Sequence, residues 1–140
     1  YYGTSIKEIE RIKKKGNIAL LEIDVQGWLQ TKQKISDALS VFILPPSVHE
    51  LWNRLNTRAS DSLENRLTRL ETAREELEYT EEYDYFILNK ELESAYDQLK
   101  KAFFTPKELI LTKKEGHKYA KKLINEFNES DWINKLKLQV

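Results

Sequence analysis

Three short apolar runs, separated by helical patterns, constrain most strongly what this 140-residue chain can fold into. They cover residues 18–23, 41–44 and 85–88. Each run is too short for a buried helix, and continuous apolar runs of this length are typical of strands that are covered on both faces of a parallel sheet. Strands that alternate with helices are joined by right-handed crossovers. The pattern through residue 104 therefore predicts an α/β fold with a parallel sheet and flanking helices.

Helical patterns fill the intervals between these runs. We expect helices over residues 4–15, 27–34, 47–58 and 63–77, the third opened by the capping box that Ser47 and Glu50 form. Asn89 is predicted to cap a further helix that continues to about residue 104. After Phe104 the regular alternation of strands and helices ends. Residues 109–112 have strand character, and a Lys-rich segment then leads into a helix ending near Asn128. We interpret residues 105–140 as a mostly helical C-terminal extension of a domain covering residues 1–104.

Composition excludes several classes of function. The 23 Lys and Arg residues balance 23 Asp and Glu residues, which argues against a general nucleic-acid binder. No apolar run approaches the ~20 residues that cross a bilayer, so no membrane partner is expected. The absence of Cys removes disulfides and thiolate catalysis and fits a reducing, cytoplasmic location. Since the chain also has no Met, we expect a processed product or, by preference, a fragment.

Two acids follow the first apolar run. Strand alternation would put Glu22 and Asp24 on the same side, about 7 Å apart along the strand. In parallel sheets ligands bind at the carboxyl ends of the strands, where such carboxylates can hold a Mg²⁺-bound water or accept hydrogen bonds from a nucleobase. The alternative is a loop carboxylate that caps the following helix.

An arginine cluster forms the second candidate site. Guanidinium groups suit phosphate oxygens and can neutralise the charge that develops on a transferring phosphoryl group. The alternative is a solvated helix surface on which these arginines pair with neighbouring glutamates. The cluster consists of Arg54, Arg58, Arg66, Arg69 and Arg74.

The remaining polar and aromatic residues suggest no further chemistry. His49 and His117 have no metal-ligand partner at helical spacing, and we interpret both as surface residues. No Ser/His/Asp arrangement can be placed, so hydrolase chemistry has no support. The three tryptophans are expected to pack in the core or lie at its rim; they are Trp28, Trp52 and Trp132.

Six blocks, in order and at matching intervals, resemble the guanylate kinase family over residues 1 to about 104. They include the Leu-Glu-Ile-Asp-Val-Gln-Gly segment at residues 21–27 and the Leu-Pro-Pro-Ser segment at residues 44–47. The six blocks are residues 1–4, 21–27, 44–47, Arg54-Leu55 with Arg58, Arg69-Leu70, and 83–85 with Asn89. The resemblance implies a P-loop nucleoside-monophosphate-kinase-type sheet and phosphoryl transfer from MgATP to GMP.

The resemblance also implies roles for residues on the GMP side of the reaction. Tyr2 matches the tyrosine whose hydroxyl holds the GMP phosphate, and Thr4 matches the residue that bonds the guanine edge. Asp24 matches the acid that accepts from guanine N–H donors, a pattern that adenine lacks. Glu22 matches an acidic position near the water shell of the Mg²⁺ that accompanies ATP.

On the ATP side, the resemblance implies an arginine-bearing lid. Arg58 and Arg69 match the arginines that close over the phosphates, with Arg54 in the same group, and Asn89 matches the loop near the adenine of ATP. The lid itself would cover about residues 59–68. Its closure would exclude water, so that GMP is the phosphoryl acceptor.

The printed sequence departs from the family pattern in one large respect. It contains no G-x-x-x-x-G-K-[ST] phosphate loop. By family topology the strand that leads into that loop would lie between residues 18–23 and 41–44. We therefore expect a sheet without its N-terminal strand, and no catalysis by these 140 residues alone. The alternative function is a guanylate-kinase-like protein-interaction module without catalysis.

Overall fold

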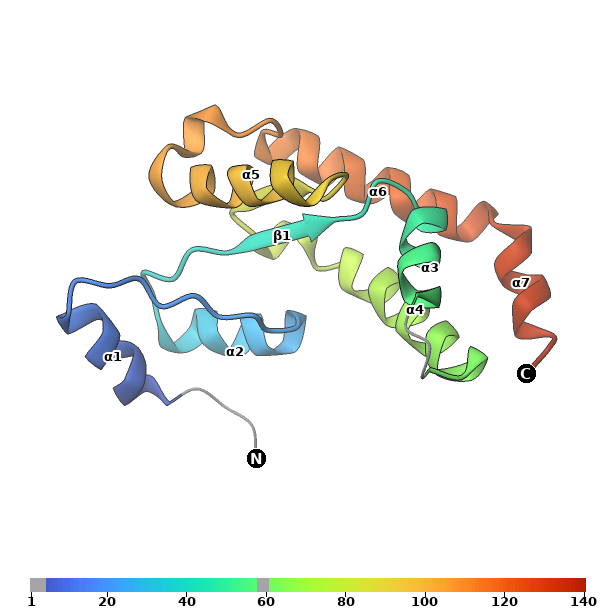
Figure 1. The fold of residues 1–140 in the computed structure, drawn as a ribbon, viewed down its shortest axis with the longest axis horizontal. Coiled ribbons are helices and arrows are strands. Elements are labelled where there is room, and N and C mark those ends of the chain that lie inside the picture. Colours follow the sequence, from blue (N-terminus) through green and yellow to red (C-terminus); the bar gives the residue numbers. More distant parts are fainter. Residues whose placement is uncertain (1–4, 58–60) are drawn as a thin grey trace.

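The computed structural model describes residues 5–57 and 61–140 as helices packed around a small sheet (Figure 1). Its two strands are β1 (Val41–Leu44) and β2 (Tyr85–Leu88). The helices before β2 are α1 (Ile6–Lys14), α2 (Val25–Lys34), α3 (Val48–Asn56) and α4 (Leu63–Leu77), with a short 3₁₀ turn η1 (Thr80–Glu82). After β2 come α5 (Leu92–Phe104), the 3₁₀ turn η2 (Pro106–Glu108), α6 (Lys113–Glu129) and α7 (Asp131–Lys137).

The sheet is parallel, as the alternation of strands and helices predicted. β1 pairs with β2 in a register that runs from Val41 opposite Tyr85 to Leu44 opposite Leu88. A polar clamp fixes the start of both strands, because an Asp84 carboxylate oxygen accepts from both the N–H and the hydroxyl of Ser40, each at 2.9 Å. The predicted strands at 41–44 and 85–88 and the α/β class are thus confirmed.

The predicted buried strand over residues 18–23 is wrong. This segment has no regular secondary structure, and 59% of Ile18 and 65% of Leu20 are exposed. A strand needs a neighbour for its backbone N–H and C=O groups. Within residues 5–57 and 61–140, no backbone–backbone hydrogen bond reaches the segment. The burial expected for the second run also fails at Ile43, which is 52% exposed.

Two helix boundaries differ from the sequence pattern for local reasons. α2 begins at Val25, two residues early, because the Asp24 side chain caps it. Asn89 caps no helix, since its N–H donates to the Leu44 carbonyl at 2.8 Å and continues the ladder. α5 begins only after Glu91. Residues 109–112 form no strand, and the side chain of Thr112 instead opens α6 through a capping box with Glu115.

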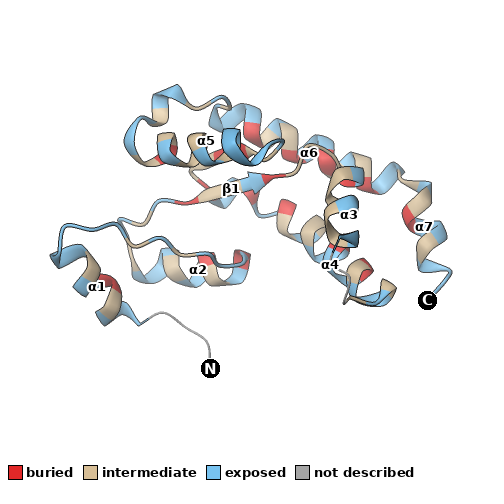
Figure 2. Ribbon diagram, viewed as in Figure 1, coloured by how far each residue is buried: buried red, intermediate tan, exposed pale blue. Residues whose placement is uncertain are grey.

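Residues after 105 share the core with the rest of the chain. α6 packs against β2, η1, α3 and α4, and its contact with β2 is close enough that Gly116 lies against the Phe86 ring. Figure 2 shows buried positions along α6 and on α7. The buried side chains that α6 and α7 contribute are Ala120, Leu123, Phe127 and Ile133. A domain boundary near residue 104 stays a prediction from composition.

The histidines and tryptophans are placed by packing. His49 is exposed, as expected, and His117 is half-buried. Its ring meets Phe86 edge-on at a centroid distance of 5.1 Å, and its Nε2 lies 3.2 Å from the Thr80 carbonyl oxygen. Trp28 and Trp52 are buried and Trp132 is half-buried, which confirms the interpretation as core or rim residues.

Candidate functional site

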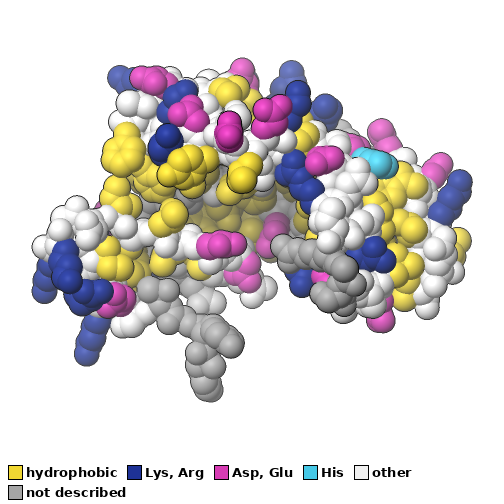
Figure 3. Space-filling model, viewed as in Figure 1, with side chains coloured by type: hydrophobic (Ala, Val, Ile, Leu, Met, Phe, Trp, Pro, Cys, Tyr) yellow, Lys and Arg dark blue, Asp and Glu magenta, His cyan; other side chains and the backbone are white. Residues whose placement is uncertain are grey.

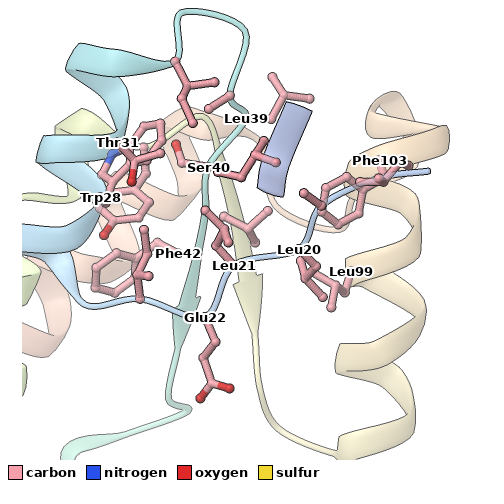
Figure 4. A pocket seen from close by; sticks show the side chains of 18 of the residues that line it. Leu20, Leu21, Glu22, Trp28, Thr31, Leu39, Ser40, Phe42, Leu99 and Phe103 are labelled. Carbon is pink, nitrogen blue, oxygen red and sulfur yellow. The ribbon is translucent and has the colours of Figure 1, made fainter. Parts of the chain in front are cut away.

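An apolar groove with a cavity volume of about 710 Å³ runs along β1, and we call it the β1 groove. Residues 18–24 form one wall, while β1 and the α5 side chains Leu99 and Phe103 form the other. Figure 3 shows apolar side chains gathered above the segment of residues 18–24. Figure 4 shows Leu20 facing Leu99 and Phe103. Its polar lining includes Glu22, Asp24, Glu76 and Tyr83. The groove therefore joins an apolar slot to a group of acids.

Asp24 caps α2 from the wall of the groove. Its Oδ1 accepts from the Gly27 N–H at 2.7 Å, which satisfies one of the unpaired donors at the helix start. The capping alternative that the sequence left open is thus what this oxygen does. Asp24 is nevertheless exposed and lines the groove, so its contact with guanine stays a prediction.

Glu22 and Asp24 do not form the pair that strand alternation predicted, because residues 18–23 are not a strand. Glu22 is exposed and points away from Trp28 and Thr31 (Figure 4). Its place near a Mg²⁺ water shell stays a prediction. Among residues 5–57 and 61–140, no group of three or more His, Asp or Glu side chains is arranged to hold a metal ion.

Glu76 is an acid of the groove that the sequence patterns did not indicate. Burial raises the pKa of its carboxyl group, and the nearby Asp24 charge raises it further, against the lowering effect of the Val25 N–H. Burial, followed by the charges of Glu76 and Asp24, likewise raises the pKa of Tyr83 to about 12. A sequence signal did exist, because Glu76 lies three residues after Ala73 and beside Leu77 on the apolar stripe of α4.

We predict that Glu76→Gln reduces the loss of stability between mildly acidic and neutral pH. A carboxyl group whose pKa is raised on folding contributes stability below its unfolded pKa, and this is lost as pH rises through the folded value. Glutamine stays neutral at every pH, so the variant lacks this pH-dependent contribution to stability. Urea unfolding across this pH range measures the difference. The exposed neighbour Glu75→Gln is the matched control, and equal pH profiles for all three proteins would contradict the prediction.

The carboxyl ends of the strands bring together two of the predicted ATP-side residues. Asn89 lies at the end of β2, next to the end of β1. Arg54, near the end of α3, donates from Nη2 to the Lys90 carbonyl at 3.3 Å. Its Nε also pairs with Glu50 at 3.0 Å. This is the pairing with a neighbouring glutamate on a solvated helix surface that was the alternative to phosphate binding. Arg54 and the turn after β2 thus meet where parallel sheets bind their ligands.

The other arginines of the cluster that the structure describes do not gather around one point. Arg69 pairs with Asp61, with Nε 3.3 Å from Oδ2. Arg66 stacks over the Trp52 ring, with 5.6 Å between its Cζ and the ring centroid. Arg74 donates to the Asn128 side chain at 3.2 Å, beside α6. The described members of the predicted cluster are therefore spread along α3 and α4.

Three of the predicted site residues lie outside the described part of the chain. These are Tyr2, Thr4 and Arg58. Of the predicted lid, residues 63–68 are described as the first turns of α4, with Ser62 as N-cap. No helix in the described ranges is both long enough and apolar enough to span a membrane.

Comparisons with known proteins agree on one family. The guanylate kinase family model matches residues 1–105. Over 107 residues the chain is 42% identical to the guanylate kinase of Desulfitobacterium hafniense, covering 76% of this chain and 54% of that protein. It is 43% identical to the Lactococcus lactis guanylate kinase over 101 residues, covering 72% of this chain and 49% of that protein. The Streptococcus thermophilus guanylate kinase is 44% identical over 101 residues, with coverages of 72% and 48%.

These matches define a nucleotide-kinase class of α/β protein, in agreement with the parallel β1–β2 pair and its flanking helices. The chain belongs to the guanylate kinase family. It spans about half the length of the curated relatives that it matches. Residues 106–140 lie beyond the family model.

Proposed function

We propose that this chain serves the guanylate kinase reaction, in which the terminal phosphoryl group of MgATP passes to a phosphate oxygen of GMP to give ADP and GDP. The family match over residues 1–105 carries this proposal. The arrangement of charged groups supports it. The Asp24 carboxylate lines the β1 groove, and the Arg54 guanidinium lies at the carboxyl ends of the strands. The P-loop kinase fold and a cytoplasmic location belong to the same proposal.

Recognition of guanine would rest on Asp24. One oxygen of its carboxylate caps α2, and the second is the acceptor that we assign to the N–H donors of the base. Because adenine lacks that donor pattern, this contact would favour GMP over AMP. Tyr2 and Thr4 are proposed to hold the phosphate and the base edge of the same ligand.

Catalysis would need positioning and charge neutralisation, without a covalent intermediate. We propose that Arg54, Arg58 and Arg69 bind phosphate oxygens, which would replace the present partners Glu50 and Asp61 of two of them. Asn89 would lie near the adenine of ATP. Mg²⁺ would enter as part of the MgATP substrate, with Glu22 contacting only its water shell.

We predict that Asp24→Asn weakens GMP binding by this chain at least tenfold. The side-chain carbonyl of Asn can still cap α2, whereas its amide group cannot accept from guanine N–H donors. A donor of the bound base that loses its acceptor costs about this much in affinity. Isothermal calorimetry with GMP measures the effect, and AMP serves as the ligand control.

A second variant separates binding from helix capping. Asp24→Ser keeps a good N-cap residue but removes the carboxylate, so we expect it to lose GMP affinity while the free energy of unfolding changes by less than about 0.5 kcal/mol. Unchanged GMP affinity in both variants would show that the guanine contact is misplaced. Binding of phosphorylated peptides in place of GMP would favour the interaction-module alternative.

A further inference from the structure

The segment beyond the family match grips the helices that carry the arginines. We call α6 and α7 together the C-terminal strap. It crosses β2 and reaches α3 and α4, whose residues include Arg54, Arg66 and Arg69 (Figure 1). We propose that the strap holds these two helices in one position against the sheet, so that Glu126 and Tyr119 act as positioning residues for the arginine-bearing helices.

The first grip is on the turn from β1 into α3. The Glu126 carboxylate accepts from the Val48 N–H at 2.9 Å. Val48 is the first residue of α3, so the contact satisfies an unpaired donor and puts a negative charge at the positive end of the helix dipole. About two turns earlier in α6, the Tyr119 hydroxyl donates to the Pro46 carbonyl at 2.6 Å.

The second grip is aromatic and lies along α3. The ring of Trp132 in α7 packs on the ring of Trp52, with 5.9 Å between centroids. The same indole meets the exposed His49 ring at 5.7 Å. Both partners belong to α3, so the helix is held at its start by α6 and along its length by α7.

The third grip is polar and lies on α4. Asn128 of α6 accepts from Arg74 Nε at 3.2 Å, and Lys137 of α7 pairs with Glu71 at 2.7 Å. Exposed ion pairs of this kind add little stability by themselves. Their placement matters, because they tie the middle of α4 to the same strap that caps α3.

This inference does not rest on the proposed function, because every contact in it joins residues of this chain to one another. The test also needs none. Its failure would leave the GMP proposal intact, and loss of GMP binding in Asp24→Asn would leave the strap intact.

The test is amide hydrogen exchange of the full chain in the double variant Tyr119→Phe with Glu126→Ala. We expect the Glu50 and Leu51 amides of α3 to exchange at least tenfold faster, since a hydrogen bond to a charged acceptor is worth about that factor in a local opening equilibrium. The α5 amides of Leu99 and Ala102, on another helix, should change less than twofold. Val48 is left out of the comparison because it loses its own acceptor.

Position is measured separately from stability by spin labels. The chain has no Cys, so Asn53→Cys and Ser94→Cys, both exposed, give one labelled pair between α3 and α5. We expect a narrow distance distribution in the parent and a broad one in the double variant. The exposed α6 variant Lys121→Ala should give the same distance distribution and the same exchange rates as the parent. In the exchange experiment, Glu126→Gln keeps a hydrogen-bond acceptor and should restore slow exchange of the α3 amides.

Two outcomes would overturn the strap. If amide exchange accelerates equally in α3 and α5, these contacts serve only global stability. If exchange in α3 accelerates by less than threefold, the contacts do not fix the position of α3. If the double variant does not fold, Tyr119→Phe alone keeps the ring and removes only the hydroxyl. We expect it to speed exchange in α3 about fivefold, the factor for a neutral hydrogen bond, and an unchanged rate would overturn the strap.

Discussion

Gly116→Ala is expected to destabilise this protein by about 3 kcal/mol or more. A Cβ at this position would lie 2.1 Å from Cγ and 2.3 Å from Cδ2 of Phe86. Phe86 is only 1% exposed and is enclosed between the sheet and α6, so its ring has little room to move. The intrinsic helix propensity of Ala offsets about 1 kcal/mol of the clash. Urea unfolding followed by circular dichroism measures the change.

Two controls identify the clash as the cause. Gly27→Ala makes the same substitution in a helix, where the new Cβ would lie 3.1 Å from Asp24 Oδ1 and the Ile23 Cβ, and we expect a change within about 1 kcal/mol. Adding Phe86→Leu to Gly116→Ala should recover part of the loss, because the two positions touch. Strictly additive effects would contradict the packing explanation.

Removal of residues 105–140 is expected to abolish cooperative folding of the remainder. The deletion takes Leu123, Phe127 and Ile133 out of the core and uncovers Phe86 on β2. Burial of one such side chain stabilises by about 1.5–3 kcal/mol, and a domain is stable by only about 5–15 kcal/mol in total. Calorimetry should therefore show no cooperative thermal transition for residues 1–104.

A shorter deletion is the matched control. Removing residues 138–140 takes away Leu138 and Val140, which are 87% and 64% exposed, and should change the free energy of unfolding by less than about 0.5 kcal/mol. A cooperative transition for residues 1–104 would contradict the prediction and would favour the boundary near residue 104 that composition suggested.

The local patterns in the sequence predicted most helices and both observed strands, together with a third strand that does not form. Ser47 caps α3, where its spacing to Glu50 indicated a helix start, whereas the cap of α4 is Ser62 and not Asp61, the residue that its spacing to Glu64 had suggested. The parallel direction of the strands at residues 41–44 and 85–88 followed from their alternation with helices, while their direct pairing is seen only in the structure. Family membership also followed from the order of short motifs, which needs no coordinates.

The errors occurred where a segment depends on a distant partner. Residues 18–23 have the composition of a strand, yet in the described structure no strand pairs with them. Asn89 has the residue type of a helix cap but bonds to Leu44 instead. His117 carries no local sign of its contact with Phe86 and is half-buried because α6 packs on β2.

The sequence by itself determined most helices, two strands of a parallel sheet and the family of this protein, because capping, apolar periodicity and motif order act over a few residues. Only the tertiary structure decided how residues 105–140 are used. Whether Glu126 caps α3, whether Gly116 touches Phe86 and whether Glu76 faces Asp24 depend on contacts between residues 30 to 78 positions apart. Such contacts are set by close packing of the whole core, which no short window of sequence contains.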